Sequence, residues 1–195
     1  MIFRIFAILI LLSFYGCYFA KMLGQKKRGI QTNQMGKGKT GAVKRIELAL
    51  KVITLIVPVV ELASIVLNTS RFPAACRIAG IVLALTGLTA FLAALVQMRD
   101  SWRAGVPTTD KTELVTDGIF ALSRNPAFLG FDLVYIGILL SFFNWPLFAV
   151  TALAALMIHL QIVNVEEEFL LKTFGEEYLR YKKRVNRYLG AKRMN

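Results

Sequence analysis

Four long apolar stretches dominate this sequence and limit its possible folds more than any other feature. They cover residues 2–20, 46–67, 74–98 and 127–165. A helix that spans a bilayer needs about 20 mostly apolar residues, so each stretch is long enough to cross a membrane. The composition agrees, because 56% of the 195 residues are hydrophobic and 18% are charged, against about 45–50% and about 25% in soluble domains. The sequence predicts an all-α, polytopic integral membrane protein and excludes a disordered chain.

The fourth apolar stretch is too long for a single crossing. It contains the sequence Asn144-Trp145-Pro146. Proline removes a helix donor and clashes with the preceding turn, and asparagine just before it favours a turn. We therefore expect a helical hairpin with spans over 127–143 and 146–165, which makes five transmembrane helices in all.

Basic residues gather in three of the segments between and after the apolar stretches. Segments 21–45 and 166–195 each carry eight Lys and Arg, and segment 99–126 carries four. The opposite side has only Arg4, Arg71 and Arg77. Cytoplasmic loops are enriched in Lys and Arg, so the N-terminus is expected outside and the C-terminus in the cytoplasm. The net charge of +12 is then mainly a topology signal, with anionic lipid headgroups as additional partners.

The segment that leads into the fourth stretch has the residues of a small binding site. Gly118 permits a tight turn or the close approach of a ligand, and Pro126 suits the first turn of a helix. The free backbone N–H groups of that turn, with Arg124 beside them, are suited to an anion such as a carboxylate. The alternative is a simple helix start at the interface, with Arg124 contacting lipid phosphate.

Three consecutive carboxylates, Glu166, Glu167 and Glu168, directly follow the last apolar stretch. The helix dipole disfavours negative charge near a helix C-terminus, so this cluster requires a cation. That cation is a neighbouring base, Lys172 or Arg124, or else the ammonium or sulfonium group of a ligand.

His159 is the only histidine of the chain and lies inside the last span. Helical spacing places Val163 and Glu167 on its face. An ionisable residue inside a span is a functional candidate by default, and packing with one hydrogen bond is the alternative.

The tail beyond the acids is predicted to form an amphipathic helix. Apolar residues recur at three- and four-residue spacing: Phe169, Leu170, Phe174, Tyr178, Tyr181 and Val185. The opposite face is basic, so the helix suits the membrane surface or a position as a lid over a cytoplasmic cavity. Gly175 is the position at which it would break.

These two segments resemble the integral-membrane methyltransferases that include isoprenylcysteine carboxyl methyltransferase and the phospholipid N-methyltransferases. The family pattern is matched by Leu114-Val115-Thr116, Gly118, Phe120, Arg124-Asn125-Pro126, Phe128 and Gly130, and then, beyond a helical hairpin, by Glu166-Glu167, Leu170, Phe174-Gly175, Tyr178, Tyr181 and Val185. The resemblance covers about residues 100–188, and its second block is the more specific.

The resemblance implies S-adenosylmethionine as the cofactor. It implies a pocket lined by Leu114, Val115, Gly118 and Phe120 and flanked by Asn125, Pro126, Ala127 and Phe128. Glu166 and Glu167 would bind the charged methionine end of the cofactor. We add His159 to the cofactor-binding set and expect Arg124 and Glu167 to be catalytic. Residues 1–195 then form one membrane domain, with three spans in 1–98 and the cofactor-binding loop, hairpin and lid helix in 99–195.

The expected function is methyl transfer to a lipophilic acceptor, with the site facing the cytoplasm. Asn125 stands where the family usually has His, so no titrating base is available there. An isoprenylcysteine-type carboxylate is favoured, because its pKa of about 3.5 makes a general base unnecessary, whereas an amine must lose a proton. Two departures concern this acceptor: Phe128 replaces the usual Tyr, and Ile162 and Asn164 occupy the region where prenylcysteine enzymes often have Arg.

Several alternatives remain open at this stage. They are a phospholipid or amine N-methyltransferase, an NADPH-dependent lipid reductase on the same scaffold, and a non-enzymatic membrane adaptor. The expected partners are a lipophilic small molecule or prenylated peptide and membrane lipid. Nucleic acid is not expected, because the basic segments lack interleaved aromatic residues. One histidine and two cysteines do not make a usual zinc site, and the sequence does not predict an oligomeric state.

Overall fold

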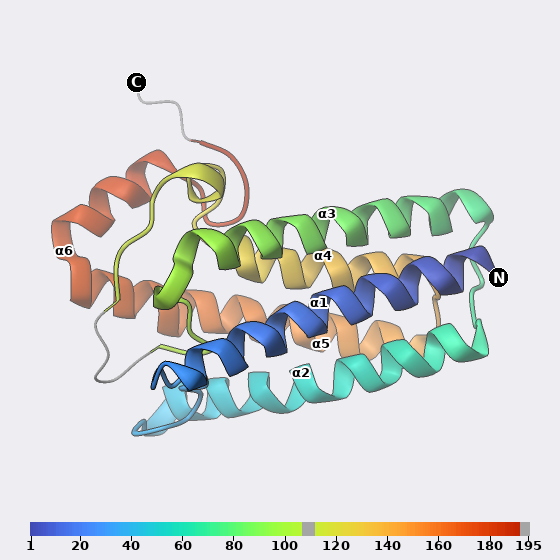
Figure 1. Ribbon diagram of the computed structural model, residues 1–195, viewed down its shortest axis with the longest axis horizontal. Helices are drawn as coiled ribbons and strands as arrows, with labels where there is room; N and C mark the ends of the chain where they lie inside the picture. Colours follow the sequence, from blue (N-terminus) through green and yellow to red (C-terminus); the bar gives the residue numbers. More distant parts are fainter. Residues whose placement is uncertain (107–111, 192–195) are drawn as a thin grey trace.

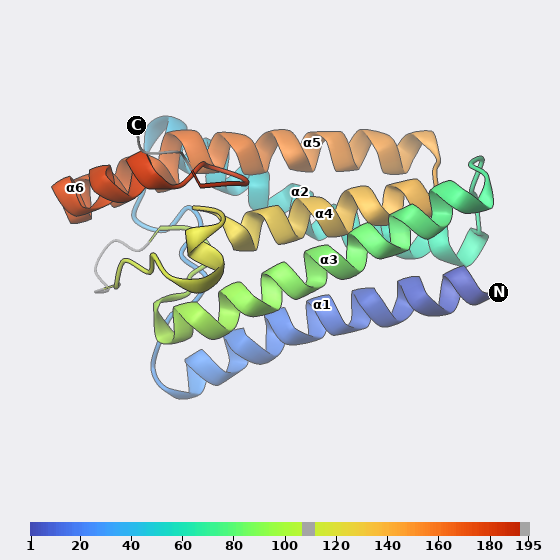
Figure 2. The same ribbon diagram turned by 90° about the horizontal axis from the view of Figure 1, so that it is seen from above.

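Five long helices lie side by side and alternate in direction along the chain (Figure 1). The computed structural model describes residues 1–106 and 112–191. The five helices are α1 (Ile2–Lys27), α2 (Gly41–Leu67), α3 (Ala74–Met98), α4 (Pro126–Ser141) and α5 (Trp145–Gln161). Helix α5 continues through a π-helical turn, η3 (Ile162–Glu166), into α6 (Glu167–Arg184), and the short 3-10 helices are η1 (Arg99–Ser101) and η2 (Gly118–Ala121). Helix α4 lies between α3 and α5 (Figure 2).

The helices confirm the prediction of an all-α, polytopic membrane protein. In the described part of the chain, four helices are long and apolar enough to cross a membrane, and the 16-residue α4 is shorter. The predicted span 74–98 coincides with α3, whereas α1 and α2 extend beyond their apolar stretches to Lys27 and back to Gly41. The total of five spans stays a prediction.

The hairpin between α4 and α5 is formed where proline and asparagine predicted it. Helix α4 ends at Ser141, and Pro146 lies in the first turn of α5. Asn144 caps α5, because its Oδ1 accepts from the Leu147 backbone N at 2.9 Å. Its Nδ2 also donates to Ser64 Oγ at 2.8 Å, which ties the turn to the end of α2.

Helices α3 and α4 meet backbone to backbone through two pairs of glycines. A Cβ atom on Gly80 would lie 2.5 Å from Gly137 O, and one on Gly87 would lie 2.7 Å from Gly130 O. Small residues allow helices in membranes to approach this closely, and van der Waals packing then holds them together. The contact fixes α4, and with it the segment that enters α4, against α3.

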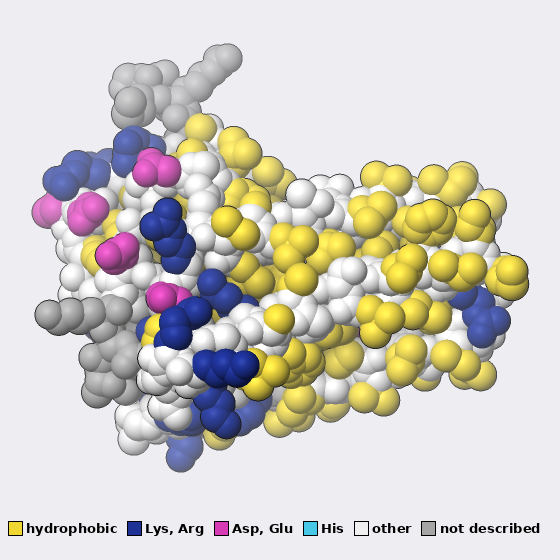
Figure 3. Space-filling view, in the orientation of Figure 1, with side chains coloured by type: hydrophobic (Ala, Val, Ile, Leu, Met, Phe, Trp, Pro, Cys, Tyr) yellow, Lys and Arg dark blue, Asp and Glu magenta, His cyan; other side chains and the backbone are white. Residues whose placement is uncertain are grey.

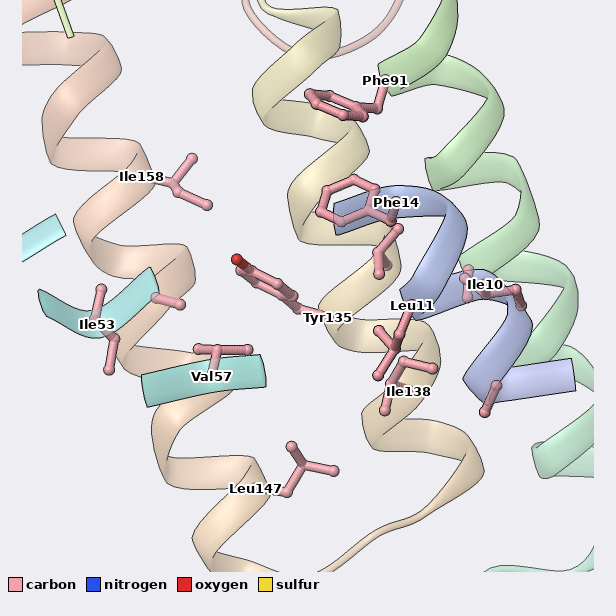
Figure 4. Packing of buried hydrophobic residues seen from close by; sticks show 14 of the residues in the cluster. Ile10, Leu11, Phe14, Ile53, Val57, Phe91, Tyr135, Ile138, Leu147 and Ile158 are labelled. Atoms are coloured by element: carbon pink, nitrogen blue, oxygen red, sulfur yellow. The ribbon is translucent and has the colours of Figure 1, made fainter. Parts of the chain in front are cut away.

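The core fills the space between the helices with aromatic and branched side chains (Figure 4). Phe14 of α1 packs on Phe91 of α3, with ring centroids 4.6 Å apart, and on Phe131 of α4 at 4.7 Å. Tyr135 of α4 points from this aromatic group toward Ile158 of α5. The core thus joins the N-terminal helices to the hairpin.

Most charged side chains gather at one end of the molecule, over α6 and the loops, with a smaller basic group at the opposite end, while apolar side chains cover the helices between them (Figure 3). The loop after α1, the segment before α4 and α6 all lie at this end (Figure 1). The three basic segments therefore share one end, as predicted, although Lys111, Lys192 and Arg193 lie outside the described residues. The membrane side to which this end belongs stays a prediction.

Helix α6 folds back over the loops at the charged end. Gly175 breaks it, with φ +50° and ψ −122°, at the predicted position. Beyond the break, Tyr178 and Tyr181 are buried against the segment that precedes α4. The Tyr181 hydroxyl donates to Phe120 O at 2.6 Å. Of the two arrangements that the sequence left open, these contacts favour a lid.

Candidate functional site

A cavity of about 550 Å³ lies within the half of the bundle nearest α6. Its volume is in the range of pockets that hold small molecules and cofactors. Both halves of the chain line it. Helices α1 and α2 contribute mainly apolar side chains, and the segment from Glu113 to Phe128, Glu166 and α6 contribute the other wall. Tyr181 and Leu170 of α6 are among the lining residues, so the lid helix forms part of the cavity.

Most of the predicted site residues line this cavity. They are Leu114, Val115, Phe120, Arg124, Asn125, Pro126, Ala127, Phe128 and Glu166. Three others, Gly118, His159 and Glu167, are not among its lining residues. The structure therefore brings together two segments that are about 40 residues apart in the chain. The role of each of these residues stays a prediction.

Arg124 lies between the cavity and the acidic cluster, with 8% of its surface exposed. Its Nη1 donates to the Tyr178 hydroxyl at 2.7 Å, and its Nη2 lies 3.0 Å from Glu167 Oε1. Its buried Nε has no partner in the part of the chain that the structure describes. A buried donor without an acceptor costs about 1–3 kcal/mol. Arg124 is therefore suited to receive an anionic group.

Glu167 is the first residue of α6 and lies beyond the apolar part of the continuous helix that α5, η3 and α6 form. Three cations surround its carboxylate. Besides Arg124, Arg187 Nε lies 2.7 Å from Oε1 and Lys182 Nζ lies 3.1 Å from Oε2. Burial alone would raise the pKa of Glu167. Hydrogen bonds from Arg187 and Lys182 and the charge of Arg124 outweigh burial and hold this pKa at about 2. Glu167 is therefore an ionised centre that fixes Arg124 and joins the tail to α4.

Glu166 has different surroundings, although it is the next residue in the chain. It lines the cavity, and its Oε1 accepts from Gln161 Nε2 at 3.0 Å. Among the described residues it forms no ion pair, whereas Glu168 pairs with Lys172 at 3.6 Å on the exposed face. Of the three carboxylates, Glu166 is thus the one at the cavity without a bound cation.

The start of α4 presents backbone donors beside Arg124. Pro126 occupies the first turn, and no side chain caps the helix. The Asn125 side chain instead donates through Nδ2 to Arg187 O at 3.0 Å, so Asn125 holds the tail against the helix start. Uncapped N–H groups and the helix dipole favour an anion at this point.

Gly118 lies behind the cavity, where it permits a tight turn against α3. Its φ is +55°, and a Cβ atom there would lie 1.8 Å from Gln97 Nε2. The next residue, Ile119, donates its backbone N–H to Gln97 Oε1 at 2.9 Å. Gly118 therefore positions the cavity wall.

His159 lies on an exposed face of α5. Its Nδ1 is 2.6 Å from the Tyr188 hydroxyl, and the two rings stack with centroids 6.1 Å apart. Tyr188 follows Arg187, the partner of Glu167, so both contacts hold the segment after α6 against the long helix. The π-turn η3 lies between His159 and Glu167 and interrupts the α-helical spacing on which the predicted shared face depended.

The sequence analysis named no residue of the first two helices for the cavity. Tyr15, Tyr18, Phe19 and Met22 of α1 and Leu50, Lys51, Thr54, Leu55 and Pro58 of α2 line it. One signal was available in the sequence. Lys51 and Thr54 are polar residues inside an apolar stretch, one helical turn apart, and polar residues inside a span mark a functional face of the helix.

The fold and the site define a polytopic helical membrane protein with a ligand-sized cavity lined by residues of α1, α2, α4, α5 and α6. Residues 75–177 match the family model described as phospholipid methyltransferase. This match covers more than half of the 195 residues, and the chain belongs to that family.

A curated relative is similar over part of the chain. The chain is 33% identical over 72 residues to protein-S-isoprenylcysteine O-methyltransferase of Schizosaccharomyces pombe. The alignment covers 37% of this chain and 30% of the relative. The chain therefore matches less than a third of that protein's length.

Proposed function

We propose that the protein transfers a methyl group from S-adenosylmethionine to a lipophilic acceptor, most favourably a carboxylate of the isoprenylcysteine type. The family membership supports methyl transfer, and the similarity to an isoprenylcysteine O-methyltransferase supports the carboxylate. The observation that carries the proposal is the cavity itself. Among the described residues, its wall carries an acid without a cation partner, Glu166, and a base with an unpaired donor, Arg124.

The residues of the cavity fit the amino-acid end of the cofactor, which carries one ammonium and one carboxylate group. Glu166 would accept from the ammonium. Arg124 Nε and the first N–H groups of α4 would donate to the carboxylate. Glu167 is a positioning residue in this scheme, because it is occupied by three cations and holds Arg124 in place. When bound, the cofactor supplies an electrophilic methyl group.

The apolar wall from α1 and α2 has its own part in the reaction. A sulfonium and a carboxylate lose charge as the methyl group moves between them, so removal of water raises the reactants more than the transition state. A cavity lined by side chains such as Phe19, Leu55 and Phe131 excludes water. The carboxylate needs no general base near neutral pH, and alignment of donor and acceptor supplies much of the rate.

The test is transfer of radiolabelled methyl from S-adenosylmethionine by the purified protein in phosphatidylcholine nanodiscs. The acceptors are S-farnesyl-N-acetylcysteine and phosphatidylethanolamine. A carboxyl methyl ester releases labelled methanol in base, whereas a methylated amine does not, so base treatment separates the two products. We expect base-labile product from the prenylcysteine. A base-stable product would mean that the acceptor is an amine and not a carboxylate. Absence of any product with the cofactor bound would contradict the proposed reaction.

A further inference from the structure

Lys51 is a basic residue placed inside an apolar span and on the wall of the cavity. It lies ten residues after the start of α2 at Gly41, which is about 15 Å along the helix axis. Lys51, Thr54, Leu55 and Pro58 recur at helical spacing, and all four line the cavity. A lysine at membrane depth is costly, by about 2.5–3.5 kcal/mol at the centre of a span. Such a residue normally faces a partner or a polar site.

No described acid pairs with Lys51. The acid one turn before it, Glu47, is fully buried and occupied by Lys39 and by the Gly36 backbone N at 2.6 Å. The other acid of α2, Glu61, accepts from the Tyr15 hydroxyl at 3.1 Å. Among the carboxylates at the cavity, neither Glu113 nor Glu166 lies within ion-pair distance of a described base. Among the described residues, the Lys51 ammonium therefore has no carboxylate partner.

The cavity wall around Lys51 faces the outside of the bundle. Leu55 of α2 and Phe19 of α1 line the cavity, yet 63% and 50% of their surfaces are exposed. In a membrane, surface of this kind contacts acyl chains. The Tyr15–Glu61 hydrogen bond joins α1 to α2, and the Lys39–Glu47 ion pair joins the preceding loop to α2. The part of the cavity wall formed by α1 and α2 therefore has exposed apolar side chains and, among the described lining residues, one lysine, Lys51.

We propose that Lys51 binds the anionic group, a carboxylate or a phosphate, of the membrane amphiphile that enters the cavity between α1 and α2. The apolar side chains of α1 and α2 contact the hydrocarbon chain of the amphiphile. The Lys51 ammonium offsets the cost of moving the amphiphile's anionic group away from the headgroup region. Lys51 then selects anionic over neutral amphiphiles. The identification of this amphiphile with the methyl acceptor rests on the proposed function. The binding of the amphiphile at Lys51 does not depend on that function.

The structure offers an optical probe for this binding. Trp102 is one of two tryptophans, lines the cavity and is 4% exposed. Replacement of the other, Trp145→Phe, leaves Trp102 as the sole tryptophan. Quenching of Trp102 is measured in phosphatidylcholine nanodiscs, without cofactor, against dibromostearate near pH 8 and against its uncharged methyl ester. A second pair compares anionic dibromo-phosphatidylglycerol with zwitterionic dibromo-phosphatidylcholine. This pair tests whether the anionic group is a phosphate instead of a carboxylate.

We expect dibromostearate or dibromo-phosphatidylglycerol to quench Trp102 at a concentration at least about tenfold lower than its uncharged or zwitterionic counterpart. Lys51→Met should reduce this preference to less than about twofold, and Lys51→Arg should retain it. Lys44→Met is the matched control, because Lys44 is an exposed base of the same helix, and it should leave the preference unchanged. Lys51→Met removes a charge from a span, so the fold should persist.

Two results would overturn the proposal. One is a Lys51→Met variant that prefers the anionic quencher as strongly as the unmodified protein does. This result would mean that the Lys51 side chain only extends toward the lipid headgroups. The other is no preference in the unmodified protein. Since quenching requires no methyl donor, failure of cofactor binding would contradict the proposed function and leave the lysine site intact.

Discussion

At the scale of single residues, the adjacent glutamates Glu166 and Glu167 differ in their contacts. Glu167 binds Arg124, Lys182 and Arg187, whereas Glu166 lines the cavity with only Gln161 bonded to it. The cluster's need for a cation was predictable from the sequence, and Arg124 was one of the partners considered. Lys182 and Arg187 were not, because α6 must first turn back at Gly175 before Lys182, and Arg187 in the segment after α6, can reach Glu167 at the start of the helix.

The Glu167→Gln change should destabilise the protein. It would leave three cations around an uncharged amide, and the loss of one partner from a buried ion pair costs about 3–5 kcal/mol. We expect a loss of about 3 kcal/mol, seen as a lower melting temperature in detergent. Glu168→Gln, on the exposed face, is the control and should stay within about 0.5 kcal/mol. Equal stability of both variants would contradict the assigned role of Glu167.

The same residue should make stability depend on pH. Its pKa is about 2 in the folded protein, below the ordinary value of 4.5. The stabilisation it contributes is therefore complete above about pH 4.5 and is lost as the pH falls toward 2. Melting temperatures of the unmodified protein and of Glu167→Gln should differ most near pH 6, and the difference should shrink steadily below about pH 4.5 toward pH 2. A constant difference over this range would exclude Glu167 as the group that titrates.

At the scale of helices, short patterns predicted some elements and missed others. Asn144 and Pro146 predicted the turn after α4 because their effects are local. The close contact of α3 with α4 depends on glycines about 50 residues apart, Gly80 with Gly137 and Gly87 with Gly130, and no local pattern pairs them. The π-turn η3 was also not predicted, since it depends on how α5 and α6 pack.

The glycine contact gives a prediction for the helix pair. Gly87→Leu places a side chain 2.7 Å from the Gly130 carbonyl oxygen, so α3 and α4 must separate. Overpacking costs about 1–3 kcal/mol. We expect the free energy of unfolding to fall by about 3 kcal/mol or more, because a backbone carbonyl can move only if its helix moves with it. Gly16→Leu in α1 is the control, since nothing lies within 4 Å of that position. Thermal unfolding in detergent compares them, and similar melting temperatures would contradict the close contact.

At the scale of the whole molecule, the charged end and the cavity coincide. Apolar stretches and Lys/Arg counts predicted the helices and their common basic end, because both follow from the membrane as a solvent. The residues of the wall from α1 and α2 were not predicted, since the family resemblance lies in the second half of the chain. That wall extends the candidate site to the first two helices.

The orientation leads to a labelling prediction. After replacement of Cys17 and Cys76 by Ala, Lys183→Cys and Arg71→Cys place a thiol at opposite ends of the bundle. Both positions are exposed. A membrane-impermeant maleimide should label Arg71→Cys in intact cells and Lys183→Cys only after the membrane is opened. The reverse pattern would place the lid and the cavity mouth outside the cytoplasm.

The central claim is that the cavity binds S-adenosylmethionine through Glu166 and Arg124. Its most direct test is calorimetric titration of the purified protein with S-adenosylhomocysteine, the stable product, with NADPH in a parallel titration. We predict saturable binding of S-adenosylhomocysteine alone, weakened by about 1–3 kcal/mol in Glu166→Gln and unchanged in Glu168→Gln. Binding of NADPH alone, or affinity for S-adenosylhomocysteine that Glu166→Gln leaves unaltered, would contradict the account.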